Sequence, residues 1–239
     1  MNYSNFGVEN ASRDRELYLS AAFPALMRKV YLWMAMALVI TGFTAYGVAT
    51  SPAAISAIMT NSVLFWGLII AEFGLVVWLS AAINRLSLSV ATLMFVAYSV
   101  INGATLSVIF LAFTMSSITK VFFITAGTFG AMAAIGYTTK KDLSGMGKFL
   151  LMALIGLIIA SVVNLFMRST GLELIVSYIG VLVFAGLTAY DTQKIKQMLM
   201  AAEDTGETAQ KIALLGALSL YLDFINLFLY LLRIFGRRD

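Results

Sequence analysis

Seven long apolar runs, separated by short polar connections, occupy the sequence from residue 30 onward. They lie near residues 30–49, 63–83, 87–113, 120–138, 149–167, 172–191 and 213–233. A run of about 20 apolar residues is long enough for an α-helix to cross the hydrocarbon core of a bilayer. The runs are continuous and do not alternate between apolar and polar positions, which excludes the strands of a membrane β-barrel. The pattern predicts an all-α integral membrane protein with seven transmembrane helices.

The connections between the runs predict one compact bundle. Most are short, so neighbouring helices must run antiparallel, and residues 28–239 are expected to form a single seven-helix membrane domain. Residues 1–27 are predicted to be a cytoplasmic N-terminal tail with a short interfacial helix, since they lack the pattern of a cleaved signal peptide. The longer connection, 192–211, predicts a helical extension followed by a turn. Pro24 and Pro52 both fall outside the apolar runs, so the helices are expected to be mostly straight.

Lysine and arginine residues are distributed unevenly between the two sides of the predicted bundle. Most fall on the side that holds the N-terminus, which predicts a cytoplasmic N-terminus by the positive-inside rule. The opposite side holds a smaller set, part of which lies at the C-terminal end: Lys120, Arg168, Arg233, Arg237 and Arg238. The seventh run either spans the membrane or enters and returns. A full span is favoured, because residues 213–232 are uninterrupted and contain no proline.

Composition limits the chemistry that this chain can perform. The 239 residues are 61% hydrophobic and include no cysteine and no histidine. Disulfides, thiolate or imidazole metal sites and Ser-His or Cys-His nucleophiles are therefore excluded, and no cofactor is expected. The formal net charge of +4 suits loops beside anionic lipid, and the sequence contains no nucleic-acid-binding module.

Three acidic residues lie within or at the ends of the apolar runs: Glu72, Asp191 and Asp223. A carboxylate at the centre of a membrane helix costs about 2.5 to 3.5 kcal/mol on insertion scales, so it is a functional candidate whose partner has to be found. Glu72 has no neutralising group nearby in the sequence, and it either faces the bundle interior in its protonated form or lines an ion path. Asp191 ends the sixth run beside Lys194 and Lys196, where it can be a solvated interfacial charge. The helix dipole disfavours an acid at the C-terminal end of a helix, so a functional role is the other interpretation.

Asp223 belongs to a polar stripe along the seventh run. Helical spacing places Ser219, Asp223, Asn226 and Tyr230 on one face, with Arg233 at its edge. A polar stripe on a membrane helix must face protein or water, which predicts that the seventh helix is the centre of the bundle. The stripe either lines an ion path or provides hydrogen bonds that hold helices together.

Other polar residues at membrane depth are assigned structural or supporting roles. Asn102 with Gly103, and Asn164, are expected to permit close helix packing. Arg85, at the cytoplasmic end of the second run, is the nearest candidate counter-ion for Asp191. It is equally consistent with an ordinary positive-inside anchor.

Three segments carry a resemblance to a known family: ALSLYLDFINLFLYLLRIFG, VFAGLTAYDTQKIK and GYTTKKDLSGMGKFL. They resemble the Bax inhibitor family, also called the transmembrane Bax inhibitor motif proteins, in its YccA-like bacterial branch. The similarity extends from about residue 27 to 236. It implies a bacterial inner-membrane protein in which a central seventh helix is wrapped by two three-helix groups, and a pH-sensitive calcium leak across the membrane.

The resemblance also implies roles for individual residues. Asp191 in AYD and Asp223 in LYLD match the family's paired aspartates, which bridge two helices as proton sensor and pore latch. Glu72 falls where some relatives place an acidic residue that lines the path, and Arg85 is the nearest match to the basic residue that braces the pair. Two carboxylates within a few ångströms cannot both ionise cheaply, so such a pair shares a proton and can bias a two-state helix arrangement. Its oxygens suit Ca²⁺ but form an incomplete shell, as expected for transient binding of an ion in transit.

The leading hypothesis is therefore a passive, proton-regulated leak for Ca²⁺ in a lipid bilayer, without enzymatic activity. One alternative is a non-transporting regulator that binds other membrane proteins or a membrane protease. A more remote alternative is an intramembrane aspartyl protease, which also needs two aspartates on neighbouring helices. Against the protease, Asp223 lies in LYLD rather than in a glycine-flanked GxGD context, and the chain has no PAL motif.

Overall fold

The computed structural model describes residues 3–202 and 205–237, with side chains from Phe23 onward. Within these ranges the chain is helical and contains no strand. Its helices are α1 (Tyr3–Ala49), α2 (Pro52–Thr60), α3 (Ser62–Ala82), α4 (Leu88–Leu106), α5 (Ile109–Ala112), α6 (Met115–Thr138), α7 (Ser144–Met167), α8 (Thr170–Met200) and α9 (Glu207–Phe235). Seven segments of the described chain are long and apolar enough to cross a membrane: 23–49, 62–82, 88–112, 115–138, 144–167, 170–200 and 207–235. The prediction of an all-α membrane protein with seven transmembrane helices is confirmed.

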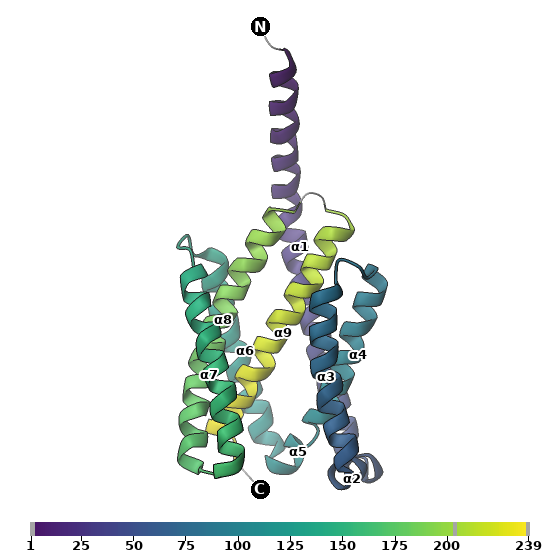
Figure 1. Ribbon diagram of the computed structural model, residues 1–239, viewed down its shortest axis with the longest axis vertical. Coiled ribbons are helices and arrows are strands. Elements are labelled where there is room, and N and C mark those ends of the chain that lie inside the picture. The colour runs from purple at the N-terminus through teal and green to yellow at the C-terminus, as the bar shows by residue number, and fades with distance from the viewer. Residues whose placement is uncertain (1–2, 203–204, 238–239) are drawn as a thin grey trace.

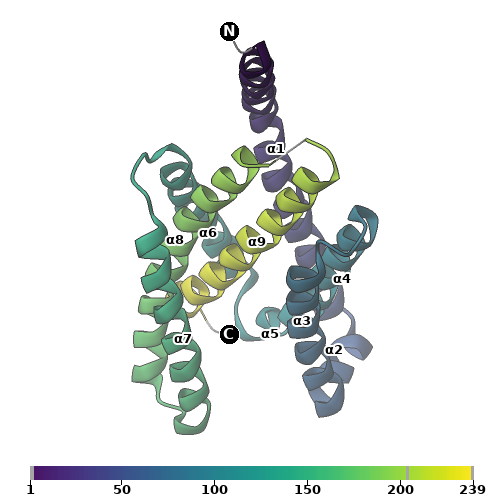
Figure 2. The same ribbon diagram turned by 45° about the horizontal axis from the view of Figure 1, so that its top comes forward.

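Helix α9 is the centre of the bundle. It crosses diagonally between one group made of α1, α3 and α4 and another made of α6, α7 and α8 (Figures 1 and 2). In its most apolar stretch 67% of the residues are buried, against 6% for α3 and 11% for α7, so α9 is covered by protein while α3 and α7 face lipid. The central seventh helix, wrapped by two three-helix groups, is as predicted.

Side-chain caps define where most of the helices begin. The side-chain oxygen of the residue before the helix accepts a hydrogen bond from a backbone N–H of the first turn, which would otherwise be unsatisfied. The capping residues are Ser51 for α2, Asn61 for α3, Ser87 for α4, Thr114 for α6 and Ser169 for α8. Pro52 is the first residue of α2, where its missing N–H costs nothing. The connection predicted around Pro52 is thus partly helical.

Close helix contacts depend on small residues. A Cβ atom at Gly136 on α6 would collide with the backbone carbonyl of Ala189 on α8, and one at Gly103 on α4 would lie 2.6 Å from the Thr41 carbonyl oxygen on α1. Glycine therefore lets these helix backbones approach each other, which is how membrane helices gain packing energy in an apolar solvent. Gly103 has the packing role predicted for it.

The N-terminal segment differs from its prediction. Helix α1 runs without interruption from Tyr3, and the first span begins at Phe23 and contains Pro24. The predicted tail with a separate short helix is therefore wrong in its structure, as is the placement of Pro24 outside the spans. Two features explain the difference: residues 8–22 are rich in helix-favouring side chains, and a membrane helix tolerates one proline where neighbouring groups replace the lost backbone hydrogen bond. The cytoplasmic location of the N-terminus stays a prediction.

Candidate functional site

Asp191 on α8 and Asp223 on α9 lie near each other where the two helices pack together. Asp223 is only 5% exposed, and its Oδ2 atom is buried with no hydrogen-bond partner in the described part of the chain. The charges of the two carboxyl groups act on each other, so the groups are neighbours across the helix interface. The structure thus brings together the two residues that the sequence singled out on separate helices. A buried carboxyl oxygen without a partner is costly, which makes this pair the least satisfied polar site on α9.

Asp191 is not at a helix end, as the sequence suggested. Helix α8 continues beyond it to Met200, so the helix dipole gives no reason for or against an acid at this position. The prediction was wrong because the apolar run stops near residue 190 while the helix itself continues as a polar extension. The helical extension predicted for residues after 192 is present.

A pocket borders Asp191 on the side nearer the N-terminus. It has a volume of about 260 Å³ and lies between the end of α3 and the facing parts of α8 and α9. Its polar lining comes from Ser80, Asp191, Lys194 and Ser219, and the remaining lining is aliphatic apart from one methionine. The pocket gives the partly buried Asp191 a route toward the surface, whereas Asp223 lies deeper.

The cation that acts on Asp191 is Lys194 and not the predicted Arg85. Lys194 lies one helical turn after Asp191 on α8, and its charge stabilises the carboxylate across that turn. Arg85 is exposed in the connection after α3 and does not line the pocket. The sequence argument chose Arg85 because it lies on the same predicted side of the membrane as Asp191 and is the nearest match to the family's bracing residue, although Lys194 follows Asp191 closely in the sequence.

The other residues of the predicted stripe have different environments. Ser219 lines the pocket beside Asp191. The Asn226 amide Nδ2 donates to the Leu222 carbonyl oxygen of its own helix at 2.8 Å. Tyr230 stacks on Phe184 with ring centroids 5.8 Å apart. Of these three residues, Ser219 shares the pocket with Asp191, and Asn226 and Tyr230 are engaged in a hydrogen bond within α9 and in ring packing.

Aromatic side chains pack α9 against α6 next to Asp223. The Phe224 ring lies 5.5 Å from both Phe122 and Phe129, measured between ring centroids, and Phe228 lies 6.4 Å from Phe122. Edge-to-face contacts of this kind pack tightly and exclude water. Passage of an ion along this interface would require α6 and α9 to separate.

Glu72 takes part in a second buried polar site, on another face of α9. Its Oε2 atom accepts a hydrogen bond from the Asn102 Nδ2 atom on α4 at 3.3 Å, and its Oε1 atom is buried without a hydrogen-bond partner in the described chain. The Asn102 amide oxygen in turn accepts from the hydroxyl of Tyr221 at 2.8 Å. Asn102 is therefore part of a network that links α3, α4 and α9, beyond the packing role predicted for it.

The network continues from Tyr221 to α1. Its hydroxyl is 2.6 Å from the Oγ1 atom of Thr41, which is also 2.9 Å from the Ser99 carbonyl oxygen, so the single Thr41 proton serves one of these two contacts. Sequence reasoning missed Tyr221 and Thr41 because it followed a single polar stripe on the seventh helix. A helix that is buried on all sides has no face toward lipid, so its polar residues outside the stripe also contact other helices. The predicted central position of the seventh helix therefore already indicated that Tyr221 could have a partner.

The connection between α6 and α7 is bound to α8 just after Asp191. The Gln193 side chain accepts from the Leu143 N–H and donates to the Lys141 carbonyl oxygen, both at 2.8 Å. Lys196 donates to the Tyr137 carbonyl oxygen at 2.9 Å, and its ammonium lies 5.1 Å from the Tyr137 ring centre. These contacts fix the turn of α8 that follows the aspartate.

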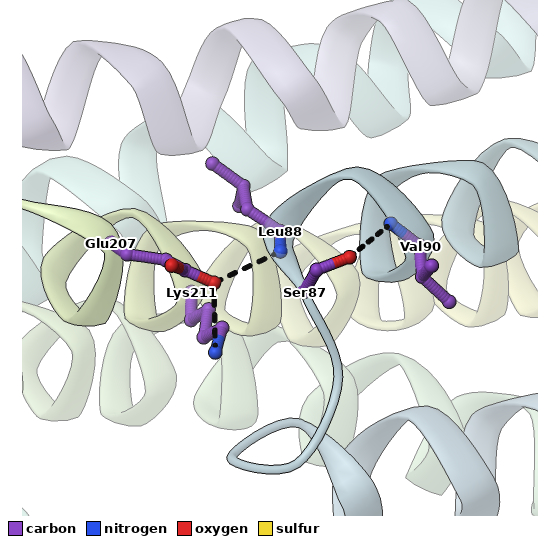
Figure 3. Close-up of polar contacts among 5 residues, drawn as sticks. All are labelled: Ser87, Leu88, Val90, Glu207 and Lys211. Atoms are coloured by element: carbon purple, nitrogen blue, oxygen red, sulfur yellow. Dashed lines mark hydrogen bonds and ion pairs between the residues drawn. The ribbon is translucent and has the colours of Figure 1, made fainter.

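A contact at the same end of the bundle holds the beginning of α9. The Glu207 Oε1 atom accepts from the Leu88 N–H at the start of α4 at 3.2 Å and lies 3.1 Å from the Lys211 ammonium (Figure 3). Ser87 caps the same first turn of α4 by accepting from the Val90 N–H. The central helix is thereby tied to the group that contains α3 and α4.

The two aspartates would supply carboxylate oxygens to a cation, which hard ions such as Ca²⁺ prefer. Among the described residues, no group of three or more His, Cys, Asp or Glu side chains is placed to hold a metal ion. Asp191 and Asp223 alone provide an incomplete coordination shell, to be completed by water or carbonyl oxygens.

Comparison with known proteins places the whole bundle in one family. Residues 24–239 match the model of the family described as "Inhibitor of apoptosis-promoting Bax1". The chain is 53% identical over 220 residues to the inner membrane protein YbhL of Escherichia coli K12. The aligned region covers 91% of this chain and 94% of that protein. It is 46% identical over 231 residues to an uncharacterized protein of Borreliella burgdorferi, covering 97% and 98% of the two chains, and 44% identical over 212 residues to RP147 of Rickettsia prowazekii, covering 89% of each.

Proposed function

Because the chain belongs to the Bax inhibitor family of membrane proteins, we propose that it is a pH-sensitive, passive calcium leak channel whose gate is the pair Asp191 and Asp223. The observation that carries the proposal is the buried, unpartnered carboxyl oxygen of Asp223 beside the carboxyl group of Asp191. The E. coli relative is an inner membrane protein, and we place this protein in the bacterial inner membrane as well. The distribution of lysine and arginine favours a cytoplasmic N-terminus.

Gating follows from the chemistry of two neighbouring acids. A shared proton lets one carboxyl group donate a hydrogen bond to the other, whereas two ionised groups repel each other across the α8–α9 contact. Protonation therefore changes the balance between two arrangements of these helices. The packing of α9 against α6 and the contact from Glu207 to α4 oppose any displacement of α9. Repulsion between the two carboxylates must therefore outweigh these contacts before the helices can separate.

The pocket beside Asp191 provides the entrance for the ion. It reaches Asp191 from the end of the bundle nearer the N-terminus, and Ser80 and Ser219 add hydroxyl oxygens to its lining. Lys194 sits at the same pocket, and its positive charge opposes cations while it remains there. Glu72 supplies a second carboxyl group at membrane depth, which we assign to the ion path on the other face of α9.

Calcium flux into vesicles tests the proposal. The purified protein is reconstituted into liposomes with an internal calcium dye, and uptake is recorded across a series of external pH values. Asp191→Asn and Asp223→Asn are each expected to change the flux and to shift or remove its pH dependence, because the one remaining carboxyl group has no second carboxyl group with which to share a proton. Asp142→Asn, in the exposed connection before α7, is the matched control. Unchanged flux and an unchanged pH profile in both gate variants would exclude the gate.

A non-transporting regulator is the second candidate, and the broad lipid-facing surfaces of α3 and α7 favour it. In this case the aspartates hold helices together, and the protein acts by binding other membrane proteins or a membrane protease. It predicts no flux in liposomes that contain only this protein, together with co-purification of a membrane protein that is lost when exposed residues of α3 such as Phe73 or Trp78 are replaced by alanine.

We propose no enzymatic activity for the aspartate pair. An aspartyl protease would need room for a peptide and an attacking water between the two carboxyl groups. The pocket instead borders Asp191, and Asp223 is enclosed by helix packing. Cleavage of a membrane-protein substrate that either Asp→Asn change abolishes would contradict this assignment.

A further inference from the structure

A second pocket is lined by residues from the end of α7, from α8 and from α9. These parts of the three helices lie at the end of the bundle remote from the N-terminus (Figure 1). It has a volume of about 440 Å³, and its polar lining consists of Ser161, Asn164, Arg168, Glu173 and Arg233. The site is separate from the aspartate pair, which is reached from the opposite end. The proposed leak activity does not use it.

Arg168 is held at this pocket by an unusual backbone conformation. It ends α7 with a φ of 50°, and among the described residues it is the one residue other than glycine with a positive φ. Glycine is the residue favoured at such a position, because a Cβ atom is strained there. The Arg168 N–H donates to the Asn164 carbonyl oxygen at 2.7 Å, and the Asn164 side-chain oxygen accepts from the Ser169 N–H at 3.0 Å. The turn is therefore fixed, and the amide NH₂ group of Asn164 is left as a donor at the pocket.

Arg233 reaches the same pocket from α9 and is also held in place. Its guanidinium carbon lies 5.3 Å from the centre of the Tyr230 ring, a cation–π contact. The Tyr230 ring is itself fixed, because it stacks on Phe184 and fills the space beside Gly180, where a Cβ atom would lie 2.7 Å from the ring. Arg168 and Arg233, from the end of α7 and from α9, thus line the same cavity, with the Arg168 backbone and the Arg233 guanidinium each held by a local contact.

The charges and the surroundings of the pocket indicate the ligand. Arg168 and Arg233 outnumber Glu173, so the lining has a net charge of +1 by the formal charges of these side chains, which matches a singly charged anion. The pocket lies at the ends of spanning helices, where lipid headgroups are expected, and its Leu165 is 65% exposed beside Phe166, which is 80% exposed. A phosphodiester with attached acyl chains fits both the charge and the apolar border.

We propose that this pocket binds the headgroup of an anionic phospholipid. The guanidinium groups of Arg168 and Arg233 hold the phosphate oxygens through charge-assisted hydrogen bonds, and the Asn164 amide adds a neutral donor. The acyl chains lie along the exposed surface of α7. With a cytoplasmic N-terminus, this end of the bundle lies on the opposite side of the membrane, where the positive-inside rule predicts few arginines. Binding of a phosphate group gives a reason for two arginines there.

Titration calorimetry with the full-length protein in detergent micelles tests the site. Dioctanoyl phosphatidylglycerol is expected to bind saturably, and dioctanoyl phosphatidylcholine and inorganic phosphate are expected to bind at least about tenfold more weakly, because each lacks either the net charge or the apolar part. Arg168→Gly and Arg233→Gln should each weaken phosphatidylglycerol binding by about tenfold, as for the loss of one charged hydrogen bond. Arg168→Gly suits the backbone at that position, so this variant is expected to fold.

Lys120→Gln is the matched control, since it removes a positive charge from the same end of the bundle outside the pocket. Equal affinity for inorganic phosphate would identify a soluble anion as the ligand and overturn the lipid assignment. Equal affinity for phosphatidylcholine would overturn the argument from charge. Unchanged phosphatidylglycerol affinity in both arginine variants, or an equal loss in Lys120→Gln, would overturn the site itself.

Discussion

The hydroxyl of Tyr221 donates a 2.8 Å hydrogen bond to the amide oxygen of Asn102, whose NH₂ group donates to Glu72. This bond connects the central helix to a buried acid on α3, on a face of α9 other than the one that carries Asp223. The bundle therefore contacts α9 through two polar sites. The aspartate pair joins α9 to α8, and the tyrosine network joins it to α1, α3 and α4.

Removing the Tyr221 hydroxyl should destabilise the protein. In Tyr221→Phe the Asn102 amide oxygen loses its donor inside the bundle, which costs roughly 1 to 3 kcal/mol for a buried polar group left unsatisfied. Thermal unfolding in detergent, followed by tryptophan fluorescence, should show a lower midpoint. Tyr178→Phe is the control, because Tyr178 is 58% exposed on α8 and its replacement should leave the midpoint unchanged. Equal midpoints for Tyr221→Phe and the wild type would show that the network adds no stability.

The organisation of the spans was predictable from the sequence because a bilayer imposes a length on every helix that crosses it. The polar stripe of the seventh run also identified the central helix, since Ser219 and Asp223 could not face lipid. Both arguments use constraints that act on a single segment. They gave the seven spans and the position of α9 without knowledge of any contact.

The partners of the polar residues were harder to predict, because they depend on where helices end and how they pack. Hydropathy marks the membrane boundary near residue 190, but α8 continues to Met200, so Asp191 lies inside the helix. The spacing of Lys194 was visible in the sequence, whereas the place of Arg85 relative to Asp191 depends on how α3 packs. Tyr221 has a largely apolar ring, so its role became visible only when Asn102 was found next to its hydroxyl. No periodicity in the sequence brings these two residues together.

Replacing Asp223 by asparagine should stabilise the closed bundle. At a pH where both carboxyl groups are ionised, the variant removes their repulsion and gives Asp191 an amide that can donate to it, so unfolding should require roughly 1 to 3 kcal/mol more. The same thermal assay in a series of rising pH should show a higher midpoint for Asp223→Asn at the alkaline end. Asp142→Asn, at an exposed acid, should show no such increase. A lower midpoint for Asp223→Asn would mean that the carboxyl group is needed for structure, and that the pair is not a strained gate.

The side chain of Gln193 should control the mobility of the connection before α7. Gln193→Leu removes two hydrogen bonds to the backbone at Lys141 and Leu143, each worth about 0.5 to 1.5 kcal/mol. Hydrogen exchange should then be faster at the Leu143 amide. Gln197→Leu, one turn further along α8 and exposed, is the control and should leave exchange at that amide unchanged. Equal exchange rates in wild type and Gln193→Leu would show that other contacts hold the loop.

Asp142 should stabilise the start of α7 in a pH-dependent way. Its carboxylate accepts a 2.9 Å hydrogen bond from the Ser144 N–H, and hydrogen bonds to Ser144 lower the pKa of Asp142 below its ordinary value. A lowered pKa in the folded state means that the contribution is complete above the ordinary pKa and is lost as the pH falls through the lowered one. A titration of the Asp142 carboxyl ¹³C resonance should show the lowered midpoint. In Asp142→Ala, hydrogen exchange at the Ser144 amide should be faster than in the wild type at neutral pH. In the wild type, protection of this amide should fall as Asp142 is protonated, and this fall should be absent from the variant. A midpoint at or above the ordinary value would contradict the hydrogen bond.

Gly136 should be intolerant of any side chain, in contrast to another glycine of the same helix. In Gly136→Ala the new methyl group meets the Ala189 backbone carbonyl on α8, two residues before Asp191, and backbone cannot move aside as a flexible side chain can. Separation of α6 from α8 should lower the unfolding midpoint and displace the turn that carries Asp191, so calcium flux and its pH profile should change as well. Gly130→Ala is the matched control, because a methyl group there meets no atom within 4 Å. That change should be neutral or stabilising by up to about 1 kcal/mol, since alanine favours the helix more than glycine does. If both variants unfold at the same temperature, the close approach of α6 and α8 at Gly136 does not determine the stability of the bundle.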